Sequence, residues 1–237
     1  MPTPSRFPFG ITNVAKSSTL GMLRGPDPTI YNTFFTDFNQ HVDADWTLTS
    51  IGSTGTAALT ALDGGCLLIT DTAADNDGTQ IQKTPASFLL AAGKRAFFKA
   101  RFKVSDALEA DFAIGLCVVD TTILGAVSGA GLTDGIFFSK DDGDALLDIQ
   151  IQKNATTGQT RQAGIATIVS DTFLTVGWYY DGVSELVYFV NDNKLGTLNA
   201  SSLYLPDVIL TPSIALLNGT DAAKTATIDY IFASKER

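Results

Sequence analysis

Carboxylates are the residues of this chain that could do chemistry. Glu109-Ala-Asp111 comes nearest to the paired acids of a glycan hydrolase. Residues two apart on a strand share a face, and a glycan hydrolase needs two carboxylates about 5–9 Å apart across the bond that it cleaves. A Glu-x-Asp-x-x-Glu pattern on one strand would supply them, but Ile114 stands where the second Glu should be. The pair also precedes an apolar run, so we predict a solvated turn there and no catalytic residues.

A second acidic group lies in the Gly-ended loop from Asp71 to Gly78, and its side chains suit a calcium ion. Asp71, Asp75 and Asp77 carry the oxygen ligands that Ca²⁺ prefers, although their spacing differs from that of an EF-hand loop. Asp, Asn and Gly are also the residues that turns require. We therefore expect no cofactor and keep these three acids as the alternative, a calcium site.

The chain lacks the residues that nucleophilic catalysis and zinc binding require. His41 is the only histidine, and no Gly-x-Ser-x-Gly motif occurs. Zinc sites need clusters of His and Cys, whereas Cys66 and Cys117 stand far apart in two apolar runs. We predict that both cysteines are buried and free. Without a nucleophile, a metal cluster or paired acids, the sequence predicts that this chain is not an enzyme.

Carbohydrate binding needs no catalytic group, so it stays open as an alternative. It would use aromatic side chains on an exposed sheet face, and the chain offers Trp46, Trp178, Tyr179, Tyr180 and Tyr188. On an extended strand, Trp178 and Tyr180 point to one face and Tyr179 points to the other. One of these faces must meet the core, so we expect most of these rings to pack internally.

The elements that must position these residues are β-strands, because apolar and polar residues alternate from Thr33 onward. Residues 96–104 show this pattern most clearly, with Lys99, Arg101 and Lys103 on the outer side. Further strands are predicted at 46–51, 66–70, 79–83, 112–119, 136–140, 146–153, 163–169, 172–180, 186–190, 194–198, 208–216 and 225–233. About twelve to fourteen strands need two stacked sheets. The predicted fold class is therefore all-β: a two-sheet antiparallel β-sandwich, a concanavalin A-like jelly roll.

Tight turns should join these strands into hairpins. Asp141-Asp-Gly-Asp144 and Asn191-Asp-Asn193 carry the residues that such turns favour. No helix-length amphipathic stretch occurs, and only a brief helical turn is expected near residues 106–111. Alternation along the closing strand predicts one face made of Ile228, Tyr230 and Phe232 and another made of Asp229 and Ile231.

Residues 1–32 differ from the rest of the chain. They hold five of the eight prolines and lack strand alternation, yet they are too apolar for a purely disordered tail. Their apolar residues are Phe7, Phe9, Ile11, Val14, Leu20, Met22 and Leu23. We predict that residues 1–32 form an extended N-terminal arm that docks on another surface or subunit, and that residues 33–237 form the jelly-roll domain. An arm that folds back on its own domain is the alternative.

The charge balance argues against nucleic acid as a partner. The formal net charge is −9 and the isoelectric point is about 4.4, whereas nucleic acid binding needs a footprint of Lys and Arg. No apolar run reaches the roughly 20 residues of a membrane span, and no signal-peptide pattern opens the sequence. We expect no membrane partner and a protein made in the cytoplasm without a signal peptide.

Four segments together resemble a group of tailed-bacteriophage virion proteins. They are residues 1–16, the segment Gly25-Pro-Asp-Pro28, residues 97–106 and residues 229–237. The resemblance spans nearly the whole chain and implies a concanavalin-like jelly roll on the outer surface of the virion capsid, assembled as a homotrimer. It implies a head decoration (cement) protein or a short head-fibre protein whose partner is the major capsid protein, and it implies no catalytic residues.

We therefore expect a non-enzymatic capsid decoration protein that binds the assembled head and stabilises it. A protein that binds the lattice but not its free subunits stabilises the lattice by mass action. Three arms on one trimer would raise the effective concentration of each contact. The alternative is a glycan-binding module of a phage head or tail fibre, for which carbohydrate is the partner.

Overall fold

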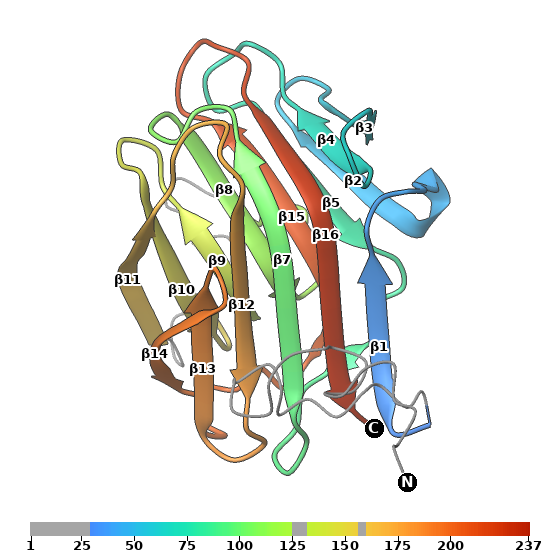
Figure 1. The fold of residues 1–237 in the computed structure, drawn as a ribbon, viewed down its shortest axis with the longest axis vertical. Helices are drawn as coiled ribbons and strands as arrows, with labels where there is room; N and C mark the ends of the chain where they lie inside the picture. Colours follow the sequence, from blue (N-terminus) through green and yellow to red (C-terminus); the bar gives the residue numbers. More distant parts are fainter. Residues whose placement is uncertain (1–28, 125–131, 156–159) are drawn as a thin grey trace, which may run out of the picture.

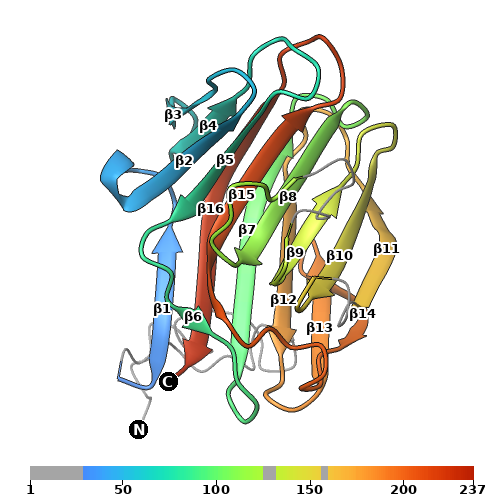
Figure 2. The ribbon, with the colours of Figure 1, turned by 180° about the vertical axis from the view of Figure 1, so that it is seen from behind.

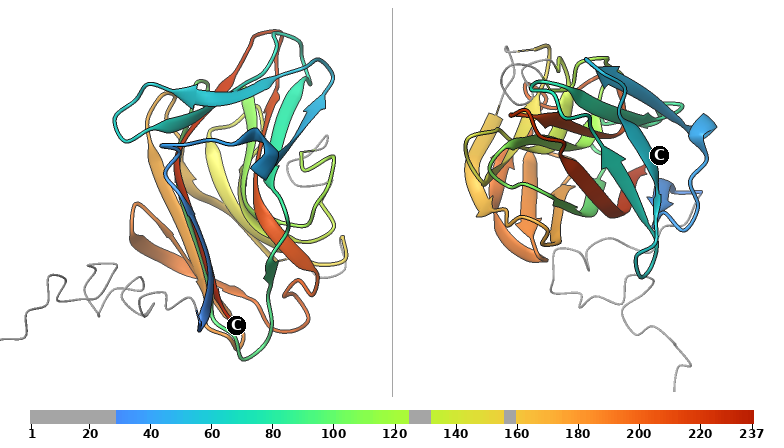
Figure 3. Two further views of the ribbon diagram at one scale, coloured as in Figure 1. Left: turned by 90° about the vertical axis from the view of Figure 1, so that its right-hand side faces the viewer. Right: turned by 90° about the horizontal axis from the view of Figure 1, so that it is seen from above.

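The computed structural model describes residues 29–124, 132–155 and 160–237, and it confirms the predicted all-β fold. Two sheets of eight strands each carry this part of the chain, and every strand pair in it is antiparallel (Figures 1 and 2). Seen from the side, the sheets form the two layers of a β-sandwich (Figure 3). We name these layers sheet A and sheet B, and call the face of each that points away from the other its outer face.

The strands divide between the two sheets as follows. Sheet A contains β1 (Tyr31–Thr36), β3 (Thr56–Thr60), β4 (Cys66–Thr70), β7 (Ala96–Val104), β12 (Leu174–Tyr180), β13 (Glu185–Val190), β14 (Asn193–Asn199) and β16 (Thr225–Glu236). Sheet B contains β2 (Trp46–Ile51), β5 (Gly78–Lys83), β6 (Phe88–Leu89), β8 (Ala110–Cys117), β9 (Gly135–Lys140), β10 (Leu146–Gln152), β11 (Thr160–Thr167) and β15 (Ile209–Asn218). One short 3₁₀ turn, η2 (Asp43–Asp45), precedes β2.

Each sheet is organised around one long strand from the end of the chain. In sheet A, β16 pairs with β7 along one side and with both β4 and β1 along the other. In sheet B, β15 pairs with β8 along one side and with β5 and β6 along the other. The last two strands of the chain, β15 and β16, therefore lie near the centre of the two layers (Figure 1).

The predicted hairpins are present, and their turn residues explain them. Asn191 and Asp192 join β13 to β14 with φ angles of 49° and 63°, the left-handed pair that two-residue hairpin turns need. The Asp181 carboxylate accepts backbone N–H bonds from Val183 and Ser184 at 2.7 and 3.0 Å. Such side-chain-to-backbone bonds stabilise a turn by satisfying its free donors. These turns place β12, β13 and β14 side by side at one edge of sheet A.

The core lies between the inner faces of the sheets. Phe102 of sheet A stacks on Phe112 of sheet B with ring centroids 4.4 Å apart. Trp178 stacks on Phe98 at 6.0 Å, and Tyr180 is also buried on this inner face. Tyr188 belongs to the same core. Three of the five rings considered for carbohydrate binding therefore pack between the sheets, which confirms that most of them are internal.

A β-bulge in β16 overturns the predicted faces of the closing strand. The pairing with β7 shifts register between Ile228 and Tyr230, so Asp229 is an extra residue. After a bulge, alternation resumes with the opposite phase. The inner face therefore consists of Ile228, Ile231 and Ala233, which belong to the main core, whereas Phe232 packs on the outer face.

Three strands and one turn were not predicted. The strands β1, β3 and β6 are short, and β1 starts at Tyr31, inside the stretch expected to be the arm. The helical turn expected near 106–111 is a hydrogen-bonded turn followed by β8, and the 3₁₀ turn lies at residues 43–45 instead. No helix in the described ranges is long and apolar enough to cross a membrane.

Candidate functional site

An open groove lies where the edge strands of the two sheets diverge. β1 belongs to sheet A and β2 to sheet B, and the loop that joins them contains η2 (Figure 1). The hollow has a volume of about 250 Å³ and is lined by Phe34, Phe35, Thr36, Gln40, Val42, Asp45, Trp46 and Lys83. We call this feature the edge groove.

The wall of the edge groove is aromatic. Trp46 is half-buried, and its ring meets Phe34 edge-on at 6.0 Å and Phe38 at 6.0 Å. Phe38 is fully buried, so it anchors the indole from behind. Phe35 lies on the neighbouring position of β1 and is 59% exposed. Successive strand residues point to opposite faces, so the Phe35 ring lies away from Trp46, 6.4 Å from Phe232 of the outer face of sheet A. The groove thus has a fixed indole in its wall and an exposed phenyl ring at its edge.

Polar side chains form the rim of the same groove. Gln40 and Asp45 are exposed, and Lys83 is half-buried opposite Trp46 in the β2–β5 pairing. The Lys83 ammonium donates to the Thr84 carbonyl oxygen at 2.6 Å. The Thr84 N–H in turn donates to the Asp45 backbone oxygen at 2.8 Å, which fixes the end of β5 against η2. The rim therefore offers amide, carboxylate and ammonium groups on a backbone that is held in place.

The outer face of sheet B looks like a second polar site, but the chain covers it. Gln80 and Gln82 point outward from β5 and are only 1% and 4% exposed. Residues 118–124 and 132–134, which we call the cover segment, follow β8 and precede β9 (Figure 2). Gln82 donates to the Val118 oxygen at 2.9 Å and accepts from the Asp120 N–H at 2.9 Å.

The cover segment also carries apolar residues that pack on sheet B. Ile123, Leu124 and Leu132 form a small hydrophobic cluster with Phe137 and Ala215 of the outer face. Gln80 completes the attachment, because it donates to the Asp120 oxygen at 2.6 Å and accepts from the Ile123 N–H at 2.9 Å. The glutamines of this face therefore bind the chain itself and are closed to a ligand.

The outer face of sheet A is aromatic and basic. Phe97, Phe189 and Phe232 form a cluster whose ring centroids lie 5.5–6.1 Å apart. Tyr179 belongs to the same cluster and is 7% exposed, which confirms that it faces opposite to Trp178. Further along β7, the Arg101 guanidinium stacks over the Phe173 ring at 4.2 Å. The predicted basic outer side of residues 96–104 is thus combined with aromatic contacts.

Glu109 and Asp111 do not form the solvated turn that we expected. Asp111 lies within β8 on the outer face of sheet B and is 7% exposed. Burial raises the pKa of its carboxyl to about 6, opposed by a hydrogen bond from the Asp142 N–H at 2.6 Å. Glu109 precedes the strand and accepts a bond from Gly219 through its backbone oxygen only. The predicted solvated turn is therefore wrong for Asp111, whose carboxyl is buried in a strand.

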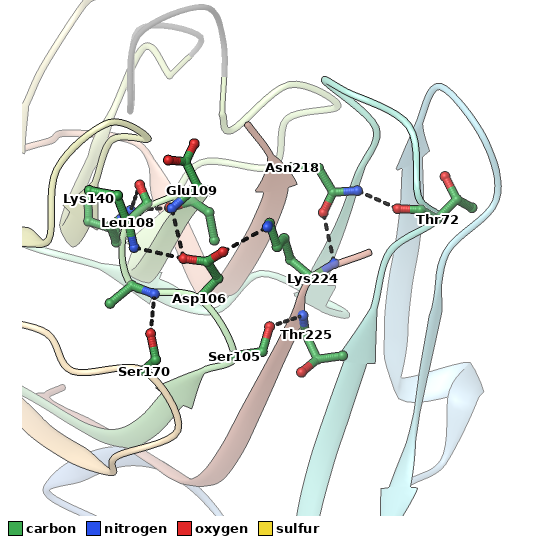
Figure 4. A network of polar contacts seen from close by, with 12 residues as sticks. Thr72, Ser105, Asp106, Leu108, Glu109, Lys140, Ser170, Asn218, Lys224 and Thr225 are labelled. Atoms are coloured by element: carbon green, nitrogen blue, oxygen red, sulfur yellow. Dashed lines mark hydrogen bonds and ion pairs between the residues drawn. The ribbon is translucent and has the colours of Figure 1, made fainter. Parts of the chain in front are cut away.

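A polar network joins the loops near Asp111, and it is structural (Figure 4). The Lys224 ammonium donates to the Asp106 carboxylate at 2.8 Å, which lowers the pKa of Asp106. Asp106 also accepts the backbone N–H groups of Leu108 and Glu109. Lys140 is fully buried, donates to the Leu108 and Ala110 oxygens, and has its pKa lowered by burial.

The structure separates the three acids of the candidate calcium loop. Asp71 and Asp77 are buried at 4% and 7% exposure, whereas Asp75 is exposed. Burial raises the pKa of Asp71 to about 7, the Thr79 hydroxyl opposes that change, and the charge of Asp77 adds to it. The described residues contain no cluster of three or more His, Cys, Asp or Glu side chains that could hold a metal ion. Asp75 therefore leaves the candidate set.

The other candidate residues have structural roles or lie outside the described ranges. His41 is half-buried beside Trp46, with its Nε2 atom 3.4 Å from the Asp43 carboxylate. Cys66 and Cys117 are buried and free, as predicted, and burial raises the pKa of Cys117 to about 12. The arm residues Phe7, Phe9, Ile11, Val14, Leu20, Met22 and Leu23 lie outside the residues that the structure describes.

The edge groove was only partly visible in the sequence. Trp46 was among the predicted carbohydrate contacts, whereas Phe35, Gln40, Asp45 and Lys83 were not. The placement of Gln80 and Gln82 on one side of the sheet could have been predicted, because they are two residues apart on a short strand. Their burial had no signal in the sequence, since it comes from a segment about forty residues away.

Comparison with known proteins supports the fold and no closer relationship. No family model and no curated protein matches the sequence. An endo-1,3-β-glucanase from Streptomyces sioyaensis superposes with a TM-score of 0.62 at 14% identity, over 90% of this chain and 99% of that one. An endo-β-1,4-glucuronan lyase from Trichoderma reesei gives 0.59 at 11% identity, over 84% and 94%. The carbohydrate recognition domain of Emp46p, in its potassium-bound form, gives 0.55 at 11% identity, over 84% and 94%.

These similarities confirm the concanavalin A-like jelly roll and correct one prediction. We expected a protein that is not an enzyme, because the sequence lacks paired acids. A glucanase and a lyase share this fold over most of the chain, so excluding enzymes was wrong. At identities of 11–14% the likeness establishes architecture and leaves the activity to the residues of the site.

Proposed function

We propose that this chain binds carbohydrate in the edge groove. The observation that carries the proposal is the position of Trp46, half-buried in an open hollow and held there by Phe34 and Phe38. A ring that is anchored on one side and accessible on the other gives a rigid flat surface at little entropic cost. The polar groups of Gln40 and Asp45 lie around the same hollow.

A sugar ring has the two kinds of surface that this groove complements. Its C–H groups make an apolar face that can stack on Trp46 or Phe35, and its hydroxyls can hydrogen-bond to Asp45, Gln40 and Lys83. Ligand sites typically combine an aromatic lining with a few polar groups that set orientation. The volume of about 250 Å³ lies just below the 300–1,000 Å³ or so of pockets for drug-sized ligands. The groove therefore suits one or two sugar units of a longer glycan.

The structural neighbours support a carbohydrate ligand in preference to other ligand classes. The glucanase, the lyase and the carbohydrate recognition domain are all described by their glycan chemistry. Their low identity transfers no residue to this chain, so the groove itself carries the proposal. The acidic net charge of −9 favours neutral or cationic glycans over strongly anionic ones.

A glycan array with the purified chain tests the proposal. We expect saturable binding that weakens tenfold or more in Trp46→Ala, because each factor of ten corresponds to about 1.4 kcal/mol of lost contact. Phe173→Ala is the matched control, since Phe173 is a half-buried ring on the far side of sheet A. Binding that is equal in the wild type and Trp46→Ala would contradict the proposal.

The same glycans should be assayed for cleavage, because the fold occurs in enzymes. Incubation of each bound glycan with the chain, followed by measurement of new chain ends, separates binding alone from binding with turnover. Asp45 is the carboxylate of the groove, so turnover at this site should be lost in Asp45→Asn. Turnover that survives this change would place the reacting groups elsewhere.

A second candidate is the decoration of a phage head, and an apolar surface patch favours it. Leu89 and Ile209 pair across β6 and β15 and are 44% and 51% exposed. Leu89 also lines a second hollow of about 390 Å³, together with Leu90, Leu205 and Pro206 among others. Exposed apolar patches on a soluble protein often mark interaction surfaces. Together with the resemblance to virion proteins, the patch suggests the major capsid protein as partner.

Binding to empty phage capsids tests the second candidate. Ile209→Lys should reduce occupancy because it places a charge in the apolar patch, while Val183→Lys, at a more exposed apolar residue elsewhere, should not. Deletion of residues 1–28 tests the arm separately, since it spares β1. Light scattering of the free protein measures the proposed homotrimer. A chain that fails to bind any capsid contradicts decoration and leaves the carbohydrate proposal standing.

A further inference from the structure

Three buried oxygen atoms near the end of β4 have no hydrogen-bond partner among the described residues other than one another. They are Oδ1 and Oδ2 of Asp71 and the hydroxyl oxygen of Thr79. Asp71 is 4% exposed and Thr79 is fully buried, so water does not satisfy them from outside. Buried polar groups are nearly always paired, and each exception requires an explanation.

These oxygens converge on one point beside Gly55. A Cβ atom built on Gly55 would collide with the Thr79 hydroxyl and would come within 2.8 Å of the Thr70 carbonyl oxygen and 2.9 Å of Asp71 Oδ1. Thr70 ends β4 in sheet A, and Thr79 lies in β5 of sheet B. The convergence therefore bridges the two sheets at one end of the sandwich.

The Asp77 carboxylate lies close to that of Asp71, and no Lys or Arg side chain of the described residues forms an ion pair with Asp71. Asp77 is 7% exposed and accepts a bond from the Thr72 hydroxyl. Lys224 lies beside Asp71 in the fold, and its backbone oxygen accepts the Asp71 N–H at 3.1 Å. Its ammonium is 2.8 Å from Asp106, and Figure 4 shows the Lys224 side chain directed toward that residue. Asp71 takes part in none of the ion pairs of the described residues.

A buried carboxylate without a cationic partner must be neutralised. The charged form is costly in a low-dielectric interior unless it is paired or coordinates a metal ion. Burial, and after it the charge of Asp77, raises the pKa of Asp71 to about 7, although the Thr79 hydroxyl opposes this. Two solutions exist: a proton on Asp71, or a cation held between the oxygens.

We propose that Asp71, the Thr79 hydroxyl and the Thr70 carbonyl bind a calcium ion, and that Asp77 provides the second negative charge beside it. All of these donors are oxygen atoms, which calcium prefers, and carboxylate, hydroxyl and carbonyl ligands are typical of its irregular six- to eight-coordinate sites. Water completes the shell. Because the ligands come from both sheets, the ion clamps the sandwich at this end.

Thermal unfolding of the full chain with and without metal tests the proposal. After treatment with EDTA, addition of CaCl₂ at constant ionic strength should raise the Tm of the wild type by about 5–10 °C at a hundredfold excess over Kd. KCl, NaCl and MgCl₂ are the comparison arms. Asp71→Asn should abolish the calcium response, and isothermal titration with CaCl₂ should show no binding to this variant.

Asp75→Asn is the matched control, because it removes the same charge from the same loop at an exposed position. It should keep the full calcium response. Thr79→Val is the second variant, needed if Asp71→Asn fails to fold, and it should weaken calcium binding severalfold. Equal losses in Asp75→Asn and Asp71→Asn would overturn the proposal, because they would indicate diffuse attraction by the acidic loop.

A proton on Asp71 is the competing outcome, and the same experiment identifies it. In that case calcium would leave the Tm of the wild type unchanged. Lowering the pH from 8 to 6 in EDTA would raise the Tm of the wild type but not that of Asp71→Asn. This pattern would overturn the calcium proposal, while calcium binding that requires Asp71 but not Asp75 would support it.

Discussion

The edge groove and the outer face of sheet B contain similar kinds of residue, but only those of the groove are accessible to a ligand. Both combine aromatic rings with amide and acidic side chains, as in Trp46 beside Gln40 and Phe137 beside Gln150. In the edge groove these groups line an open hollow. On sheet B the cover segment packs over them, and the glutamines are at most 4% exposed.

The difference shows that polar side chains on a sheet face do not by themselves make a binding site. A buried glutamine whose bonds are all made by its own chain stabilises the fold, because breaking those bonds leaves buried groups unpaired. An exposed amide at an open rim, such as that of Gln40, is hydrated, so it needs no partner within the chain and remains available to a ligand. Substitutions on sheet B should therefore change stability, whereas substitutions in the groove should change affinity.

The largest effect is expected for Gln82→Ala. This change removes two bonds to the cover segment and one to Ser213, so it should lower the free energy of unfolding by about 3 kcal/mol. Urea denaturation measures the loss. Gln162→Ala is the control, because Gln162 is exposed on β11 and should stay within about 0.5 kcal/mol of the wild type. A small effect at Gln82 would mean that the cover segment is held by its apolar contacts alone.

The pH dependence of stability sharpens the comparison at Asp111. Its pKa is raised to about 6 by burial, so the folded protein keeps a proton that the unfolded chain loses above about pH 4. This group therefore stabilises the fold at low pH, and its contribution falls as the pH rises through 6. The stability of the wild type relative to Asp111→Asn should drop by about 2 kcal/mol between pH 4 and 7. A constant difference across this range would contradict the raised pKa.

A smaller effect is expected at the polar rim of the groove. Asp45→Asn keeps the shape but removes the charge from a carboxylate that is exposed. We expect about a fivefold loss of glycan affinity, equal to roughly 1 kcal/mol for one hydrogen bond to a charged group. Titration calorimetry with the best array glycan measures it. Asp43→Asn, at an exposed acid outside the lining, should have no effect.

The smallest effect is expected for Phe35→Ala. The ring is 59% exposed, so its removal should change stability by less than about 0.5 kcal/mol. Glycan affinity should fall by about threefold if the ring contacts the ligand. A large loss of stability, as expected for rings of the covered face, would show that the groove is closed and would remove the contrast between the two regions.

Much of the fold could be predicted from local patterns. The segments 46–51, 66–70 and 96–104 coincide with β2, β4 and β7, because alternation and β-branched residues specify half-buried strands. The strands β1 and β6 escaped prediction, since they depend on pairing with strands far away in the chain. β3 also escaped it, although its partner β4 is the next strand. The closing strand was placed correctly but given the wrong faces, because one extra residue at Asp229 reverses the alternation.

The candidate sites were less predictable than the strands. Trp46 and the acidic loop were recognised by residue type, and Asp71 and Asp77 do lie together. Asp75 was wrongly grouped with them, since three acids close in sequence point to different environments. Asp111 was taken for a solvated turn residue, but its carboxyl is buried between β8 and the loop that carries Asp142.

The sequence by itself determined the all-β class, the hairpin turns, the buried free cysteines and the absence of a nucleophile motif. These follow from composition and from contacts within a few residues. The tertiary structure decided which polar residues are covered, which ring lines an open groove and which buried oxygens converge. The reason is physical: burial and convergence arise when segments far apart in the chain, such as β5 and the cover segment, meet in space.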